Sequence, residues 1–167
     1  MLTKRPGNLG RYLPADWCEG YTNVWLGVSV DDRKHGFPRL DILRETPAAV
    51  RFLSCEPLLE DVSDIDLTGI DWVIVGGESR AGSRVFDVEW ARKLRDRCGE
   101  SHTPFIFKQL GSRAVEDGTS VALDKLQPNG KRDRHGKYSA YFPPDLMVQE
   151  WPDPNAVSQS HPDGPYR

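Results

Sequence analysis

The chain has 167 residues, which is enough for one domain with a hydrophobic core but short for two. Its formal net charge of −3, with 28% charged residues, gives no general attraction to nucleic acid. No apolar run is long enough to span a bilayer, and the opening MLTKRPGNLG lacks the apolar core of a secretion signal. We therefore expect a cytoplasmic protein without a membrane segment.

Strand and helix patterns alternate along the first two-thirds of the chain. We predict, in chain order, a strand stub in LTKRP followed by a short helical piece, strand 24–30, helix 37–46, strand 50–55, strand 71–75, helix 87–99 and strand 104–108. Pro38 is expected in the first turn of its helix, and Asp87 is expected to cap the second helix. The alternation indicates βα units and a parallel sheet, so the predicted fold class is α/β.

The alternation stops beyond Gly111, where turn formers and charged residues dominate. Segment 141–152, YFPPDLMVQEWP, carries aromatic and apolar side chains and is expected to dock on the core. We therefore expect one domain over residues 1–151 and a disordered tail over 152–167. The basic run KRDRHGK at 131–137 is expected to be a solvated loop, with a nucleic-acid contact as the less favoured alternative.

The three cysteines, Cys18, Cys55 and Cys98, are scattered in the sequence. An odd, scattered set argues against a disulfide framework and for a reducing compartment. No Cys-x-x-Cys pair and no histidine pair at ligand spacing is present, so no local metal site is predicted. A catalytic thiol at Cys55 is disfavoured because no histidine lies in a predicted strand or helix, and we expect a small buried residue there.

Side chains of the predicted strands alternate between two faces of the sheet. One face is apolar and suits packing on helices, whereas the other becomes polar toward the carboxyl end of each strand. Parallel α/β folds bind ligands at that end, so we predict a ligand-binding mouth. Its candidate residues are Ser29, Asp31, Ser54, Glu56, Gly76, Gly77, Glu78 and Lys108. The alternative is that these residues are polar only because the chain reaches solvent there.

Gly76 and Gly77 end the predicted strand DWVIV, but their spacing fits neither of two standard phosphate loops. A dinucleotide fingerprint needs Gly-x-Gly-x-x-Gly at a helix start, and a P-loop needs Gly-Lys-Ser/Thr. Glycines at a strand end instead permit a bulge or the close approach of a ligand. Arg80 and Arg84 are weaker candidates for anion binding, with simple solvation as the alternative.

Lys108 ends an apolar strand, so its aliphatic stem is expected to be buried. Beside Glu56 or Glu78 it would form a buried ion pair. Because buried pairs contribute little net stability, such a pair favours a role in ligand binding.

Six segments occur here in a characteristic order: LTKRP, NVWLGVSV, RFLSCEPLL, GIDWVIVGGESR, FIFKQLG and YFPPDLMVQEWP. Together they resemble the C-terminal half of a phage and bacterial family, the phage gene-product thirty-seven/sixty-eight family. Longer members of that family resemble radical S-adenosylmethionine proteins, with a three-cysteine motif suited to a 4Fe-4S cluster. The resemblance implies a partial (β/α) barrel with four to five parallel strands, flanking helices and an irregular C-terminal segment.

The cysteine motif of that family is absent from this chain, and its scattered cysteines do not form a local triad. The resemblance therefore implies no cofactor for this chain alone, and a cluster with S-adenosylmethionine only beside a separate N-terminal half-barrel polypeptide. That polypeptide or a homo-oligomer is the expected partner, with closure of the opening by the C-terminal segment as an alternative. We expect the chain alone to be inactive. The other hypotheses are a non-enzymatic ligand- or protein-binding remnant and, less favoured, a nucleic-acid-binding module.

Overall fold

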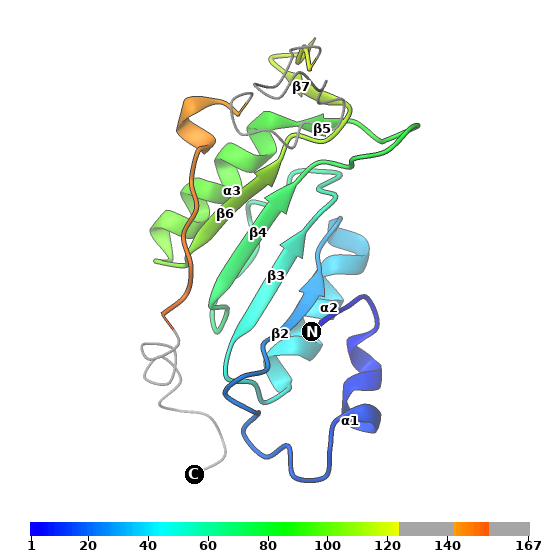
Figure 1. Ribbon diagram of the computed structural model, residues 1–167, viewed down its shortest axis with the longest axis vertical. Coiled ribbons are helices and arrows are strands. Elements are labelled where there is room, and N and C mark those ends of the chain that lie inside the picture. Colours follow the sequence, from blue (N-terminus) through cyan, green and yellow to red (C-terminus); the bar gives the residue numbers. More distant parts are fainter. Residues whose placement is uncertain (124–141, 154–167) are drawn as a thin grey trace, which may run out of the picture.

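The computed structural model describes residues 1–123 and 142–153 of the chain. At its centre lies a parallel sheet of five strands in the order β1-β2-β3-β4-β6 (Figure 1). The strands are β1 (Leu2–Thr3), β2 (Leu26–Ser29), β3 (Arg51–Cys55), β4 (Trp72–Gly76) and β6 (Phe105–Gln109). The predicted α/β class is confirmed, and the sheet is open, as a partial barrel allows.

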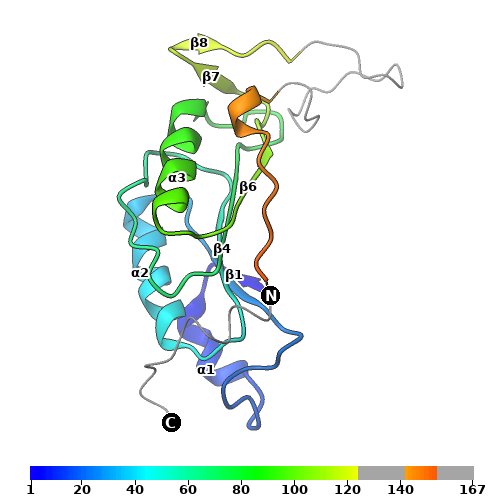
Figure 2. The same ribbon diagram turned by 90° about the vertical axis from the view of Figure 1, so that its left-hand side faces the viewer.

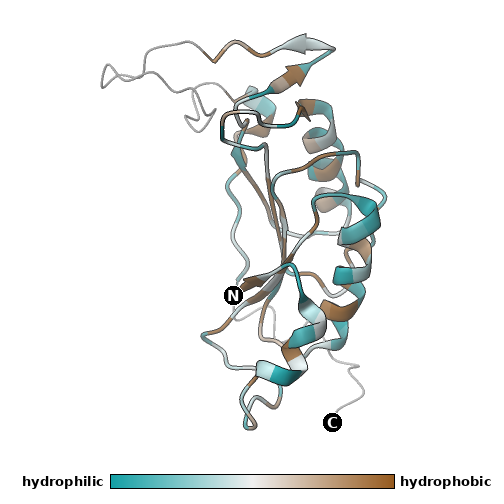
Figure 3. Ribbon diagram, turned by 90° about the vertical axis from the view of Figure 1, so that its right-hand side faces the viewer, coloured by the Kyte–Doolittle hydropathy of each residue, from teal (hydrophilic) through white to brown (hydrophobic). Residues whose placement is uncertain are grey.

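Two long helices cover one face of this sheet. Figure 2 shows α2 (Arg33–Glu45) and α3 (Val88–Glu100) on one side and the segment 142–151 on the other. The predicted helical piece after β1 consists of η1 (Pro6–Asn8) and α1 (Leu9–Tyr12). Hydrophilic residues follow the outer side of the helices, and hydrophobic residues follow the strands (Figure 3). This arrangement places the core between the sheet and the two long helices.

The starts of the two long helices depend on aspartate caps. Asp87 caps α3 as predicted, with its side chain accepting a hydrogen bond from Glu89 N at 2.9 Å. α2 begins earlier than predicted, because the carboxylate of Asp32 accepts from His35 N at 2.7 Å and caps an extra turn. Pro38 therefore lies inside α2, which corrects the expectation that it stands in the first turn.

The predicted division of strand side chains between two faces is confirmed. Val28, Leu53, Val73 and Phe107 have no exposed surface and belong to the hydrophobic cluster beneath the helices. The other face carries an aromatic group in which Trp72 contacts three rings. Its ring centroid lies 5.9 Å from Trp25, 6.0 Å from Phe52 and 4.7 Å from Trp151.

A second small sheet was not predicted. It contains β5 (Phe86–Asp87), β7 (Ala114–Glu116) and β8 (Thr119–Ser120), and β7 and β8 form an antiparallel hairpin. Asp117 and Gly118 join its strands with φ angles of 50° and 72°. An Asp-Gly pair is a strong signal for such a turn, and this signal was available in the sequence.

The C-terminal segment docks as predicted. Leu146, at the end of η3 (Pro144–Leu146), is fully buried, and the chain then runs antiparallel along the outer edge of β6. Phe107 N donates to Val148 O at 3.1 Å, and Glu150 N donates to Phe105 O at 3.0 Å. The segment therefore covers an edge that would otherwise expose unpaired backbone groups.

The remaining expectations concern the basic run, the C-terminal tail, a partner polypeptide and a membrane segment. The basic run 131–137 and most of the predicted tail, 154–167, lie outside the described residues. Pairing with a second polypeptide stays a prediction. Among the helices in the described part of the chain, none combines the length and apolar character needed to cross a membrane.

Candidate ligand-binding site

The candidate residues meet at one edge of the sheet because parallel strands end on the same side. The register of β2 and β3 places Ser29 directly beside Ser54. Both serines are buried, with 3% and 6% of their surface exposed. Within the described residues, neither side-chain hydroxyl takes part in a hydrogen bond. The edge thus contains two neighbouring hydroxyl groups that are free to bind a ligand.

Asp31 lies just beyond β2 at the same edge, and only one of its two carboxylate oxygens has a partner among the described residues. Its Oδ2 pairs with Lys4 Nζ and lies 3.9 Å from Arg39 Nη1, which also donates to Ser29 O at 3.0 Å. Its Oδ1 is buried and has no hydrogen-bond partner among the described residues. Leaving such a buried acceptor unsatisfied costs about 1–3 kcal/mol, so this oxygen favours a ligand that donates a hydrogen bond.

Lys4 and Arg39 were not among the predicted site residues. Lys4 is the residue after the stub strand β1. Its charge was a usable signal, because a charged residue also follows β2, β3 and β4 within two positions: Asp31, Glu56 and Glu78. Arg39 lies on α2, and nothing in the sequence indicated that this helix reaches back to the end of β2.

Lys108 pairs with Glu56, with a distance of 2.7 Å between Nζ and Oε2. The prediction left Glu56 and Glu78 open as partners, and the structure selects Glu56. The expectation of a buried pair is wrong, since the Lys108 side chain is 54% exposed. A register shift between β4 and β6 at Gly76 leaves Lys108 without an opposing residue, and its side chain turns toward solvent. A pair this exposed contributes little stability and is free to exchange partners.

Glu78 is held by the two arginines that were predicted to bind anions. Arg84 Nε and Nη2 donate to its two carboxylate oxygens at 3.0 and 3.1 Å, and Arg80 Nη2 lies 2.8 Å from Oε1. The side-chain and backbone hydrogen bonds from Arg84 lower the pKa of Glu78 to about 2. The hydrogen bond to Glu78 raises the pKa of Arg84, and the charges of Asp31 and Asp32 raise it further. The loop after β4 is therefore electrostatically coupled to the end of β2.

Gly76 and Gly77 allow the ends of β4 and β6 to approach each other. A Cβ atom on Gly77 would lie 2.1 Å from Leu110 O, and one on Gly111 would lie 2.6 Å from the carbonyl carbon of Gly77. Gln109 Nε2 donates to Gly77 O at 2.8 Å across this contact. Of the two predicted roles, the bulge is observed, and the space beside Gly77 is occupied by the chain's own backbone.

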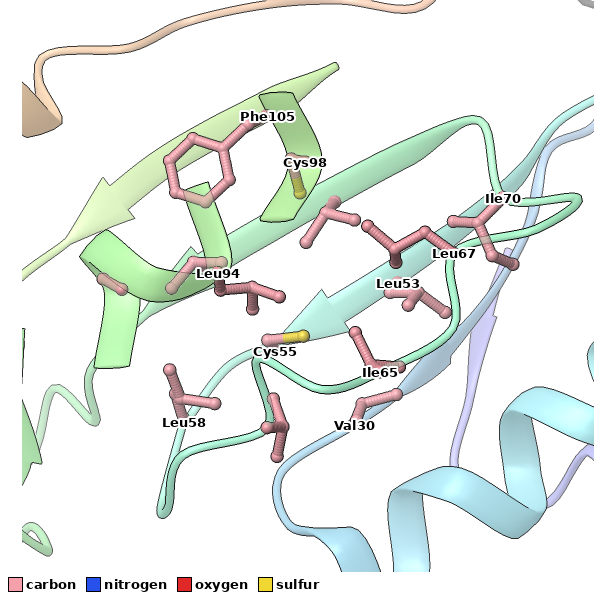
Figure 4. Packing of buried hydrophobic residues seen from close by; sticks show 14 of the residues in the cluster. Val30, Leu53, Cys55, Leu58, Ile65, Leu67, Ile70, Leu94, Cys98 and Phe105 are labelled. Carbon is pink, nitrogen blue, oxygen red and sulfur yellow. The ribbon is translucent and has the colours of Figure 1, made fainter. Parts of the chain in front are cut away.

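The cysteines do not fit an iron–sulfur cluster. Cys55 and Cys98 lie among aliphatic side chains in the core, as Figure 4 shows, and Cys18 is exposed. Burial raises the pKa of both core thiols, that of Cys98 to about 12, whereas cluster ligation needs thiolates. In residues 1–123 and 142–153, no group of three or more His, Cys, Asp or Glu is placed to hold a metal ion.

Comparison with known proteins gives one match. No curated protein and no solved structure matches the chain. The family described as protein of unknown function (DUF5131) matches residues 1–143. That range contains the whole parallel sheet, both long helices and every residue of the candidate site. The chain therefore belongs to the DUF5131 family.

Proposed function

We propose that this chain binds a small zwitterionic ligand at the carboxyl edge of its sheet. S-adenosylmethionine, which the family resemblance implies only beside a separate N-terminal half-barrel polypeptide, is the proposed ligand. The observation that carries the proposal is Asp31 Oδ1, a buried carboxylate oxygen without a hydrogen-bond partner among the described residues. An ammonium group is the donor that best satisfies such an oxygen, because the hydrogen bond is then charge-assisted.

The rest of the edge supports the same class of ligand. Lys108 is half-exposed and can exchange Glu56 for the carboxylate of a ligand. Ser29 and Ser54 supply two adjacent hydroxyl groups, each of which can accept or donate a hydrogen bond. An amino-acid head group contains both an ammonium and a carboxylate, and its ammonium complements the buried oxygen of Asp31.

We assign ligand binding, and not cluster chemistry, to this chain. The buried thiols of Cys55 and Cys98 do not suit a 4Fe-4S cluster. A radical reaction would need a cluster supplied by a separate polypeptide, which the family resemblance implies. Without that partner, the same site makes the chain a binding module with no activity of its own.

Isothermal titration calorimetry of the full chain with S-adenosylmethionine tests the proposal. Asp31→Asn keeps the side-chain shape and removes the charge, and we expect it to weaken binding by about tenfold or more. Asp41→Asn is the matched control, because Asp41 is an exposed carboxylate on α2. We expect this control to bind as the unchanged chain does.

Titration with a second ligand measures how much the amino-acid head group contributes to binding. Methylthioadenosine carries the nucleoside and sulfur but no amino-acid head group, so we expect it to bind more weakly and equally to both forms. The proposal fails if S-adenosylmethionine does not bind, or if Asp31→Asn binds it with unchanged affinity.

A further inference from the structure

Lys4 and Asp31 form an ion pair at the carboxyl edge of two neighbouring strands. Lys4 directly follows β1, Asp31 lies two residues beyond β2, and the two strands pair in parallel. Lys4 Nζ donates to Asp31 Oδ2, which belongs to the same carboxylate as the buried Oδ1 that has no partner among the described residues. A positive charge therefore stands directly beside the oxygen to which the ammonium of the ligand is assigned.

The ammonium group of Lys4 has hydrogen-bonding capacity left for a ligand. It carries three N–H donors, and among the described residues its one hydrogen-bond partner is Asp31. Its side chain is 52% exposed, so a ligand can reach it from solvent. The side chain of Arg39, which also lies near Asp31, is only 18% exposed, and its Nη1 already donates to Ser29 O. Lys4 is therefore the accessible cation in contact with Asp31.

Lys108 is the other lysine at this edge, and its position suits a different group. Among the described residues it pairs with Glu56, beyond β3, and not with Asp31. In an α-amino acid the ammonium and the carboxylate are attached to one carbon atom, so the carboxylate lies beside whatever holds the ammonium. Lys4 can bind such a carboxylate while it keeps its own pair with Asp31, whereas Lys108 would have to leave Glu56.

From this geometry we infer that Lys4 recognises the carboxylate of an α-amino-acid head group whose ammonium is held by Asp31. The contacts close a ring: the ligand ammonium donates to Asp31 Oδ1, and Lys4 Nζ donates both to Asp31 Oδ2 and to the ligand carboxylate. Each contact joins opposite charges and is charge-assisted. The site thus selects α-amino acids and their derivatives over amines that lack the carboxylate. This inference rests on the proposed function, because it needs the ligand ammonium on Asp31.

Two ligands that differ only in the carboxylate test the inference. S-adenosylmethionine and its decarboxylated form share the ammonium, the sulfonium and the nucleoside, and each is titrated into the full chain by calorimetry. We expect the unchanged chain to bind S-adenosylmethionine about tenfold more tightly than the decarboxylated form. In Lys4→Met we expect this ratio to fall to about one. Loss of Lys4 also alters the surroundings of Asp31, but that change acts on the ammonium that both ligands share, so the ratio reports on the carboxylate alone.

Two further variants accompany Lys4→Met. Lys4→Arg keeps a positively charged donor and is expected to retain the preference for S-adenosylmethionine. Lys34→Met is the matched control, because Lys34 is an exposed lysine at the start of α2 and its loss changes the net charge equally. We expect this control to leave the ratio unchanged. Thermal unfolding of each variant establishes that it is folded.

The outcomes separate this inference from the function on which it rests. The inference alone is overturned if S-adenosylmethionine binds and Asp31→Asn weakens it, but the unchanged chain shows no preference or Lys4→Met keeps it. Loss of the preference in Lys108→Met would then place the carboxylate at Lys108. If neither ligand binds the unchanged chain, the proposed function fails and the inference fails with it.

Discussion

Single residues at the carboxyl edge have unequal roles. Gly77 is structural, because Leu110 O occupies the place where its Cβ would lie. Glu78 is held by Arg80 and Arg84 and has little capacity left for a ligand. Asp31, by contrast, keeps a buried oxygen without a partner in the described part of the chain. The same strand-end pattern therefore contains both positioning residues and the residue that carries the proposed function.

Replacing Gly77 with alanine is expected to destabilise the fold. The added Cβ would lie 2.1 Å from a backbone oxygen, and overpacking of this kind costs about 1–3 kcal/mol. Gly10→Ala is the matched control, because a Cβ on Gly10 in α1 meets no atom within 4 Å. Chemical denaturation of both variants checks the prediction, and equal stability of the two would contradict it.

The Glu78 contacts are expected to make stability depend on pH. Its folded pKa of about 2 lies below its ordinary value of 4.5, so folding favours the carboxylate. The resulting stabilisation is complete above pH 4.5 and is lost as the pH falls toward about 2. Glu78→Gln should therefore be less stable than the unchanged chain near neutral pH, with the difference shrinking across this acidic interval. Denaturation at several pH values measures it, and a difference that stays constant would refute the assignment.

At the scale of the elements, the C-terminal segment completes an open sheet. It buries Leu146, pairs with β6 and brings Trp151 onto Trp72. Asp145 anchors the segment to α3, because Arg92 Nε donates to it at 3.0 Å and Arg95 Nη1 donates to it at 2.6 Å. These contacts hold the C-terminal segment against both α3 and the edge of β6.

Shortening Leu146 is expected to loosen this segment. Leu146→Ala removes a fully buried side chain and should cost about 2–5 kcal/mol. The neighbouring Met147→Ala is the control, since Met147 is 58% exposed and its change should fall within about 0.5 kcal/mol. Hydrogen exchange at Phe107 N, which donates to Val148 O, should become faster in Leu146→Ala only. Unchanged exchange there would show that the segment does not dock through Leu146.

For the molecule as a whole, one core between the sheet and its two long helices encloses two of the three cysteines. The exposed Cys18 lies outside that core. The thiols therefore give a measure of the global fold, because the buried ones become reactive only when the core opens.

Thiol labelling is expected to modify one cysteine in the native chain and all three after denaturation. Cys18→Ser should leave no rapidly reacting thiol, since Cys55 and Cys98 are almost fully buried. Mass spectrometry of the labelled protein counts the modified residues. Rapid native labelling of Cys55 would contradict the core described here.

The sequence by itself determined the α/β class, the five strands of the parallel sheet and the division of their side chains between two faces. It did so because strand alternation and aspartate caps such as Asp87 are local properties of the chain. It also placed Ser29, Asp31 and Ser54 at one edge, since parallel strands end on the same side.

Only the tertiary structure decided which hydrogen bonds and ion pairs the polar residues at this edge form. The pairing of Lys108 with Glu56 and of Arg84 with Glu78 depends on a bulge and a loop path that no local pattern encodes. The packing of Trp151 on Trp72 was not predicted either, because the two rings come from segments that are distant in the sequence. Local patterns fix the elements, and long-range packing fixes which polar atoms are left for a ligand.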